Sequence, residues 1–221
     1  MHEAVGNHVS LAVNKSGTQF LINPNLLHFN LIKASDLLIL DAYDSETPNR
    51  PNSPDPTAWG LHSSIHRECP HHRCLMHVHS RYATILASLA DSKLPAIDQN
   101  SAAFFRRVVI DSDYGGLAFE NEGQRCSELL NDPKKKVLIM GNHGVMIMGD
   151  SVADTFNRLY YFERAAATYI QALQTGRPLR IMPDLVAERV AAETDSYNGF
   201  AERHLENLMA ILDKEGSDYA N

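Results

Sequence analysis

Residues 74–79 read Cys-Leu-Met-His-Val-His. Its short apolar run predicts a buried β-strand. Successive side chains of a strand point to opposite faces, so His77 and His79 share one face, at about the separation needed to bind one metal ion. Histidine is concentrated here, since six of the 11 histidines lie between His62 and His79. The stretch therefore predicts a strand that carries a histidine-based site.

A third histidine can join this pair. His143 lies in Gly141-Asn-His-Gly144, directly after the apolar run at 137–140, so a strand ends there in a glycine-flanked turn that presents the ring outward. Three neutral imidazoles leave one position of a divalent ion open, as in catalytic sites. Zinc is the expected ion, and manganese, iron or cobalt also accept nitrogen ligands. On spacing alone, ordinary core or surface histidines remain the alternative.

Strand and helix patterns alternate on both sides of residues 74–79. The predicted strands cover residues 9–13, 19–22, 37–40, 74–79, 107–111 and 137–140. The predicted helices cover residues 57–70, about 80–90, 122–130, 151–174, 184–193 and 199–214, with Thr57 and Ser151 as caps. This interleaving predicts one α/β domain over residues 1–221, with a central sheet covered by helices. The sheet is expected to be mixed, because the opening hairpin at 9–22 is antiparallel.

Composition excludes several classes of protein. The net charge of −7 over 221 residues argues against nucleic-acid and acidic-membrane partners, which need a basic face. No apolar run reaches about 18 residues, so no membrane span is expected. The N-terminus lacks the features of a signal peptide, and the three cysteines suit a reducing compartment. We therefore expect a cytoplasmic protein.

Other histidines and cysteines are weaker candidates for a site. His62 and His66 have the i, i+4 spacing of a helical chelate, but the preferred interpretation is that one packs under the sheet and the other faces solvent. The segment Cys69-Pro-His-His-Arg-Cys74 superficially resembles a zinc loop. It lacks a second ligand pair at standard spacing, so we interpret it as a helix-to-strand connection.

Four motifs occur together in this chain. They are Gly6-Asn-His-Val-Ser10, Pro56-Thr-Ala-Trp59 followed by His62, Cys74-Leu-Met-His-Val-His79, and Gly141-Asn-His-Gly144 with Gly149-Asp-Ser-Val-Ala-Asp154. In this order, over about residues 4–175, they resemble the class II aldolase/adducin family. The resemblance implies a three-layer α/β/α fold and a divalent ion held by His77, His79 and His143. It also implies a cyclic homotetramer with sites at subunit borders. Residues 180–221, beyond these motifs, are predicted to form a helical extension.

The chain departs from the family pattern at three places. Ala58 stands where the aldolases carry an acid/base glutamate, and alanine cannot move a proton. The segment Asn23-Pro-Asn-Leu26 lacks the glycine and hydroxyl groups of the phosphate-binding loop, which favours an unphosphorylated substrate. The chain also starts almost directly at the motif containing Gly6, where family members usually have a preceding helix.

These observations predict a metal-dependent lyase, of aldolase or decarboxylase type, that cleaves a C–C bond in a small hydroxy-carbonyl or carboxylic-acid compound. Decarboxylation tolerates Ala58, because carbon dioxide leaves without a base removing a hydroxyl proton. Asp98 is the candidate acid/base, with an N-cap role as its alternative. Asn7, Asn23 and Thr57 are candidate substrate-binding residues. The alternative functions are a non-catalytic, adducin-like scaffold and a metal-dependent sugar-phosphate epimerase.

Assembly has weaker support in the sequence. The long helix at 151–174 carries Tyr160, Tyr161, Phe162 and Tyr169, which is more aromatic surface than one helix face easily hides. Such residues are common in subunit contacts, although core packing also explains them. We expect a homo-oligomer, and the resemblance implies a tetramer.

Overall fold

The computed structural model describes residues 3–113 and 122–221 and is built on one seven-stranded mixed sheet. The strand order is β3-β2-β1-β4-β7-β6-β5, with β5 and β6 parallel and the other neighbours antiparallel. The strands are β1 (His8–Ala12), β2 (Gln19–Ile22), β3 (Leu38–Asp41), β4 (Cys74–Val78), β5 (Val108–Asp111), β6 (Val137–Met140) and β7 (Gly144–Gly149). The strand predicted from residues 74–79 is therefore the middle of the sheet.

Helices follow the strands along the chain. They are α1 (Pro56–Glu68), α2 (Arg81–Ala87), α3 (Gln99–Ala102), α4 (Glu122–Leu129), α5 (Val152–Gln174), α6 (Asp184–Asp195) and α7 (Phe200–Lys214). Three short 3-10 turns lie at Phe29–Leu31, Ala34–Asp36 and Thr47–Asn49. The described helices and strands interleave as the sequence predicts.

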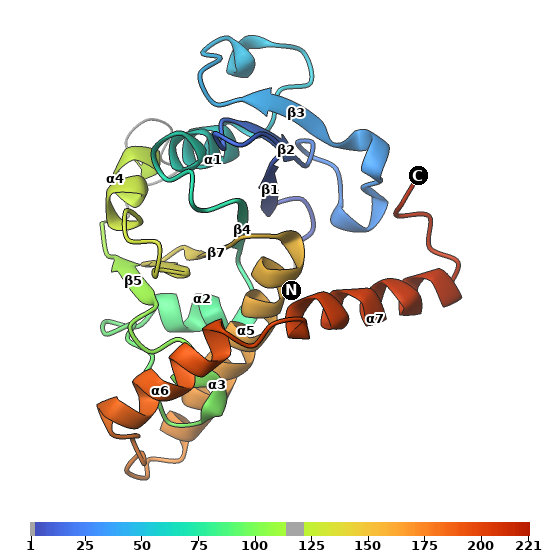
Figure 1. Cartoon of the computed structure of the whole chain (residues 1–221). Helices are drawn as coiled ribbons and strands as arrows, with labels where there is room; N and C mark the ends of the chain where they lie inside the picture. The colour runs from blue at the N-terminus through green and yellow to red at the C-terminus, as the bar shows by residue number, and fades with distance from the viewer. Residues whose placement is uncertain (1–2, 114–121) are drawn as a thin grey trace.

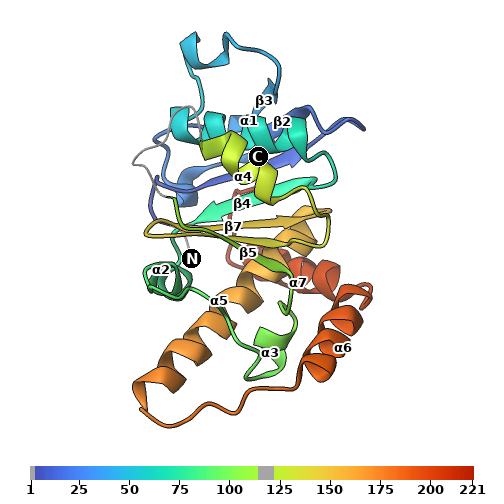
Figure 2. The same cartoon turned by 90° about the vertical axis from the view of Figure 1, so that its left-hand side faces the viewer.

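Helices cover both faces of the sheet, which gives the three layers visible in Figure 2. On one face, Leu61 and Ile65 of α1 and Cys126 of α4 pack against strand residues that include Leu75 and Met146. On the other face, α2 and α5 pack against the alternate strand residues, among them Cys74, Met76, Val78, Val145 and Ile147. β4 is buried along its whole length because both of its faces are covered. The expected three-layer α/β/α architecture is confirmed.

Two details differ from the sequence prediction. β7 is absent from the predicted strands, although Gly144–Gly149 lies beside β4 and is fully buried. Asp55, rather than Thr57, caps α1, since its carboxylate accepts hydrogen bonds from the backbone N–H groups of Thr57 and Ala58. The longest helix begins as predicted, because the Ser151 hydroxyl accepts a hydrogen bond from the N–H of Asp154.

The two C-terminal helices are attached very differently. α6 buries Ala187 and Ala191, and the guanidinium of Arg107 pairs with Glu188 at 2.6 Å and with Asp195 at 3.0 Å. α7 has no buried residue and extends away from the three layers (Figure 1).

Aromatic residues of α5 contact residues of α7. Tyr160 packs edge-on against His204, and Tyr161 lies 5.9 Å, between ring centroids, from Phe200. Phe162, by contrast, belongs to the core beneath the sheet. The aromatic surface of the long helix is thus shared between the core and α7. Among the described residues, no helix combines the length and apolar character needed to cross a membrane.

Candidate metal centre

Three histidines converge at one end of β4. The rings of His77 and His79 have centroids 4.8 Å apart, and the ring of His143 lies 4.8 Å from the first and 5.0 Å from the second. One nitrogen from each ring can be chosen so that all three lie within 4.8 Å of one another. Among the described residues, this is the grouping of histidine, cysteine and acidic side chains that could hold a metal ion.

The backbone around the third ring is a tight turn between β6 and β7. Asn142 has a positive φ of 57°, and its N–H donates to the carbonyl of Ala87 on the neighbouring helix. The N–H of His143 donates to the carbonyl of Met140, which closes the turn. The following strand then runs antiparallel to β4, with Val145 opposite Val78. The sheet register therefore returns His143 to the end of β4, where His79 lies.

Burial keeps the innermost ligand candidate neutral. His77 is 1% exposed, and this burial holds the pKa of its imidazole well below the ordinary value, with smaller contributions from His8, His143 and His79. A neutral imidazole has the nitrogen lone pair that a metal ion requires. His77 can therefore act as a ligand without first losing a proton at neutral pH.

Carboxylates border two of the three rings. The Glu3 carboxylate accepts a hydrogen bond from Nδ1 of His79, which leaves Nε2 of this ring without a proton when the imidazole is neutral. Glu122, buried at the start of α4, has Oε1 3.7 Å from Nδ1 of His143. Histidine ligands of metals commonly have such a carboxylate neighbour, which fixes the tautomer and the ring orientation.

The spacing of two of the three nitrogen atoms is close to that in a zinc site. Nε2 of His77 and Nε2 of His79 face each other at 2.9 Å. Zinc–nitrogen bonds of about 2.0–2.1 Å in a tetrahedral site separate two ligand nitrogens by roughly 3.3 Å. A shift of a few tenths of an ångström would therefore let both rings bind one ion. The donor set, three imidazoles without thiolate, suits zinc and other first-row divalent ions.

Two predicted substrate-binding asparagines have different environments. Asn23 is saturated: its Oδ1 accepts from the N–H of Val9, and its Nδ2 donates to the carbonyls of Asn7 and Pro24. Asn7 is 2% exposed, and its Oδ1 accepts from the N–H of Glu3, but its Nδ2 has no partner among the described residues. A buried donor without a partner is costly, so Asn7 is the better candidate to bind a ligand.

The other two predicted residues serve as helix caps or cap partners. The Thr57 hydroxyl donates to the carboxylate of Asp55, the residue that caps α1. Asp98 caps α3, since its Oδ1 accepts from the N–H of Ser101 at 2.8 Å and from its hydroxyl at 2.5 Å. This is the capping role that the sequence offered as the alternative for Asp98. A role in catalysis for Asp98 and in substrate binding for Thr57 remains a prediction.

Ala58 lies in an apolar cluster on α1. Its neighbours there are Phe20, Ile22 and Ala42, all at most 3% exposed, together with partly buried residues that include Trp59. The position where the resemblance would place a glutamate is thus occupied by an alanine packed among apolar side chains.

His62 and His66 are both fully buried, so the expectation that one of them faces solvent is wrong. Both rings contact the hydroxyl of Ser10 on β1, because the i, i+4 spacing puts them on the face of α1 that covers this strand. The thiol of Cys69 donates to the carbonyl of Ser127, as expected for a buried structural cysteine.

Three residues beside the candidate metal ligands do not lie at the spacing of any known metal-binding motif. Glu3 and Glu122 reach the histidines only through the fold, from segments 76 and 21 residues away from their partners. His8 is paired with His77 in the β1–β4 register, and their rings stack with centroids 4.6 Å apart. Sequence patterns alone do not show this neighbour, because they do not record that β1 pairs with β4.

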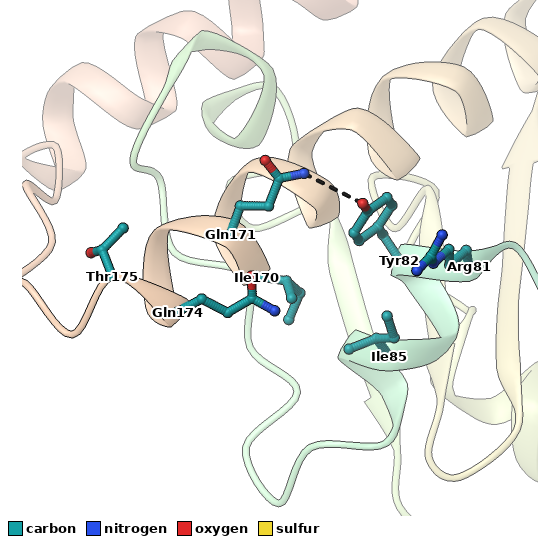
Figure 3. A pocket seen from close by; sticks show the side chains of 7 residues that line it. All are labelled: Arg81, Tyr82, Ile85, Ile170, Gln171, Gln174 and Thr175. Atoms are coloured by element: carbon teal, nitrogen blue, oxygen red, sulfur yellow. Dashed lines mark hydrogen bonds between the residues drawn. The ribbon is translucent and has the colours of Figure 1, made fainter.

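Two cavities lie away from the histidines. One, of about 600 Å³, is a hollow between α2 and α5, where Gln171 donates to the hydroxyl of Tyr82 (Figure 3). The other, of about 1010 Å³, lies between α3, α5, α6 and the start of α7. Its cation Arg158 is already paired with Asp154 and Asp195. Neither cavity is lined by His77, His79 or His143.

Comparisons with known proteins agree with the fold. The sequence profile of the family described as Class II Aldolase and Adducin N-terminal domain matches residues 1–170. The chain therefore belongs to the class II aldolase and adducin family.

Relatives in this family include proteins with different names. A putative aldolase class 2 protein of Caulobacter vibrioides is 26% identical over 99% of this chain and 85% of its own length. Decarboxylase NovR of Streptomyces niveus is 24% identical over 86% of this chain and 67% of its own length. An aldolase II superfamily protein from Pseudomonas syringae superposes with a TM-score of 0.86 at 28% identity, over 100% of this chain and 88% of that one.

Proposed function

We propose that this protein is a divalent-metal-dependent lyase that cleaves a C–C bond in a small, unphosphorylated hydroxy-carbonyl or carboxylic-acid substrate. The observation that carries the proposal is the convergence of His77, His79 and His143, with Nε2 atoms of the first two at 2.9 Å. An ion bound there, most simply zinc, supplies a Lewis acid that stabilises negative charge on substrate oxygen atoms. The family contains relatives named as aldolase and decarboxylase, which supports this reaction class.

The residues around the histidines supply binding and proton transfer in this proposal. The free Nδ2 of Asn7 donates to a polar group of the substrate. Proton transfer is assigned to Asp98, as predicted from the sequence, with the buried carboxylate of Glu122 as the competing candidate. Decarboxylation is the favoured reaction, because it needs no base to remove a hydroxyl proton and so tolerates the apolar packing of Ala58.

We also propose a cytoplasmic homotetramer that acts on a small molecule. Shared sites at subunit borders, as the family resemblance implies, would give α7, which buries no residue, a partner. Light scattering tests the assembly: a mass near four times 24.6 kDa is expected, and a mass near that of one chain would contradict it.

The first test of the reaction class is elemental analysis of protein purified without added metal or a histidine tag, compared with His143→Ala. The side chain of His143 is 20% exposed, so its loss should leave the fold intact by circular dichroism. About one zinc, manganese, iron or cobalt per wild-type chain, and little in the variant, is expected. Hydroxy-acids and aromatic carboxylates are then screened for C–C cleavage, with Asp98→Asn and Glu122→Gln as paired variants. Asparagine keeps the capping oxygen of Asp98, so a lost activity there reports on the acid rather than on α3.

A scaffold function is the second candidate. It is favoured by the apolar packing of Ala58, because a protein without catalysis has no need for a glutamate there. It predicts no bound metal after reconstitution and no cleavage of any substrate in the screen. A metal-dependent epimerase would instead require a phosphorylated sugar, which the saturated side chain of Asn23 does not favour.

A further inference from the structure

A buried chain of polar side chains runs from the histidine cluster into the layer between β1 and α1. Nδ1 of His8 lies 2.7 Å from Nε2 of His62, and Nδ1 of His62 lies 2.5 Å from the hydroxyl of Ser10. The same hydroxyl lies 2.7 Å from Nε2 of His66. All four residues are at most 7% exposed. Burying polar side chains costs free energy unless they are hydrogen-bonded, and each of these four has at least one hydrogen bond to another of them.

One end of this chain meets the candidate metal ligands. His8 and His77 are directly opposite each other in the antiparallel pair β1–β4. Their rings stack at an interplanar angle of 21° with centroids 4.6 Å apart, while His62 packs edge-on against His8. His8 itself is not part of the three-histidine cluster. Its ring therefore supports the flat face of His77 from the neighbouring strand.

The hydrogen bonds restrict how the His8 ring can turn. A serine hydroxyl carries one hydrogen, so Ser10 cannot donate to both His62 and His66, and at least one ring must donate to it. The proton positions along the chain are thus linked, and rotation of His8 would break the bond to His62 in a buried place. The bonds that join His62 to His8 and to Ser10 therefore oppose rotation of the His8 ring.

The far end of the chain argues against a role in conducting protons. Nδ1 of His66 is buried and has no hydrogen-bond partner among the residues that the structure describes. The His66 ring stacks on Phe20, with centroids 4.5 Å apart, so an apolar ring lies beyond it. A proton moved along the chain would have no acceptor there, which leaves orientation as the role that fits the geometry.

We propose that His8 is a positioning residue for the metal ligand His77, and that Ser10, His62 and His66 hold the His8 ring in place. The inference rests on the proposed function, because it concerns how firmly the proposed site holds its ion. Partners of metal ligands outside the first layer typically change metal affinity 10–100-fold when removed. A stacked ring on the adjacent strand acts in the same way, by holding Nε2 of His77 toward His79.

Titration of the metal-free protein with Co²⁺, followed by visible absorption, tests the proposal. Ser10→Ala removes the hydroxyl in the middle of the chain, and His8→Phe keeps an aromatic ring but cannot bond to His62. Ser64→Ala is the matched control. Ser64 is a buried serine on α1 whose hydroxyl bonds to Ser127, away from the hydrogen-bonded set of His8, His62, Ser10 and His66. Both test variants are expected to bind Co²⁺ about tenfold more weakly than wild type, with shifted d–d bands, and the control to match wild type.

The outcomes separate this inference from the proposed function. Wild-type affinity and spectrum in both test variants, or an equal change in Ser64→Ala, would overturn the positioning role and leave the metal site intact. No Co²⁺ binding by wild type would overturn the proposed function and the inference together. A lower Tm with an unchanged spectrum would mean that the chain only stabilises the fold. Should His8→Phe not fold, Ser10→Ala alone decides, because it removes a single atom.

Discussion

Gly144 lies so close to the ring of His79 that no larger residue fits between them. A Cβ atom at position 144 would lie 2.7 Å from Cδ2 of His79 and 2.7 Å from the carbonyl oxygen of Val78. The β4–β7 register causes this approach, since Val145 pairs with Val78 and brings the preceding glycine against the residue that follows β4. The glycine after His143 thus makes room for a neighbouring histidine of the cluster.

Gly144→Ala is therefore expected to weaken metal binding as well as the sheet. The new methyl group must push the His79 ring aside or separate β7 from β4, because the Val78 carbonyl belongs to the backbone and cannot turn away. We expect less than one bound ion per chain by elemental analysis and a lower Tm. Gly141→Ala is the comparison, since its Cβ would make a tight contact of 3.1 Å with the Asp111 carbonyl but would meet no histidine. Equal metal content in both variants would contradict the explanation.

Ala58→Glu is expected to destabilise the fold rather than restore an aldolase site. The substitution would place a carboxylate among Phe20, Ile22 and Ala42 in an apolar cluster. Burying an unpaired charge is among the costliest single changes, so a loss of about 3 kcal/mol or more in the free energy of unfolding is expected. Urea denaturation measures it, and Ala58→Gln separates the effect of size from that of charge. A variant that is stable and binds metal more tightly would show that position 58 reaches the ion.

Gly123→Ala tests the contact between α1 and α4. In an unpacked helix this change would stabilise by roughly 1 kcal/mol, because alanine is the better helix former. Here the new Cβ would lie 2.2 Å from the carbonyl oxygen of Gly60 and 2.8 Å from Cβ of Ser64, so the helices must separate. We expect a net destabilisation of about 1–3 kcal/mol by urea denaturation. Gln124→Ala, at an exposed neighbouring position, should be close to neutral, and a stabilised Gly123→Ala would disprove the close approach.

Stability should fall as the solution becomes acidic. Burial lowers the pKa of His66 to about 3, with a smaller effect of Arg73, and lowers the pKa of His72 to about 3, with smaller effects of His71 and Lys136. In the unfolded chain these rings titrate near 6.5, so below that pH the unfolded state binds protons that the folded state does not. Each ring then lowers the free energy of unfolding by up to about 1.4 kcal/mol for each unit that the pH falls between 6.5 and 3.

Urea denaturation at several pH values across this window checks the expectation. His72→Leu removes one of the two rings, so its free energy of unfolding should fall less steeply with acid than that of wild type. Parallel slopes for the two proteins would show that His72 takes up its proton in the folded state.

Local patterns predicted most of the elements but not their edges. The opening hairpin, β4 and the Ser151 start of α5 each have a strong signal of alternation, apolar run or cap, and all three are present. β7 is missed because Gly144 is assigned to the turn around His143, although residues 145–148 form an apolar run bounded by glycines. Its burial comes from the neighbouring strands, which a local pattern does not record.

The histidine cluster could be predicted because its members lie on short motifs, while their supports could not. His77 and His79 are placed together by the two-residue period of a strand. Glu3, Glu122 and His8 join them through strand register and helix placement, which depend on the whole sheet. Neither did the i, i+4 spacing of His62 and His66 show which way α1 faces, and both turned out to lie against Ser10.

The outward course of α7 has a consequence for how the isolated chain opens. A helix that buries no side chain gains little from the core, so its hydrogen bonds can break while the sheet stays intact. Amide hydrogens of residues 200–214 should then exchange with solvent deuterium long before those of α5, whose Phe162 and Ala165 are fully buried. The exchange rate of α7, the helix that extends outward in Figure 1, would thus show how firmly this helix is held. Slower deuterium exchange in α7 after a second molecule is added would show that this molecule binds there.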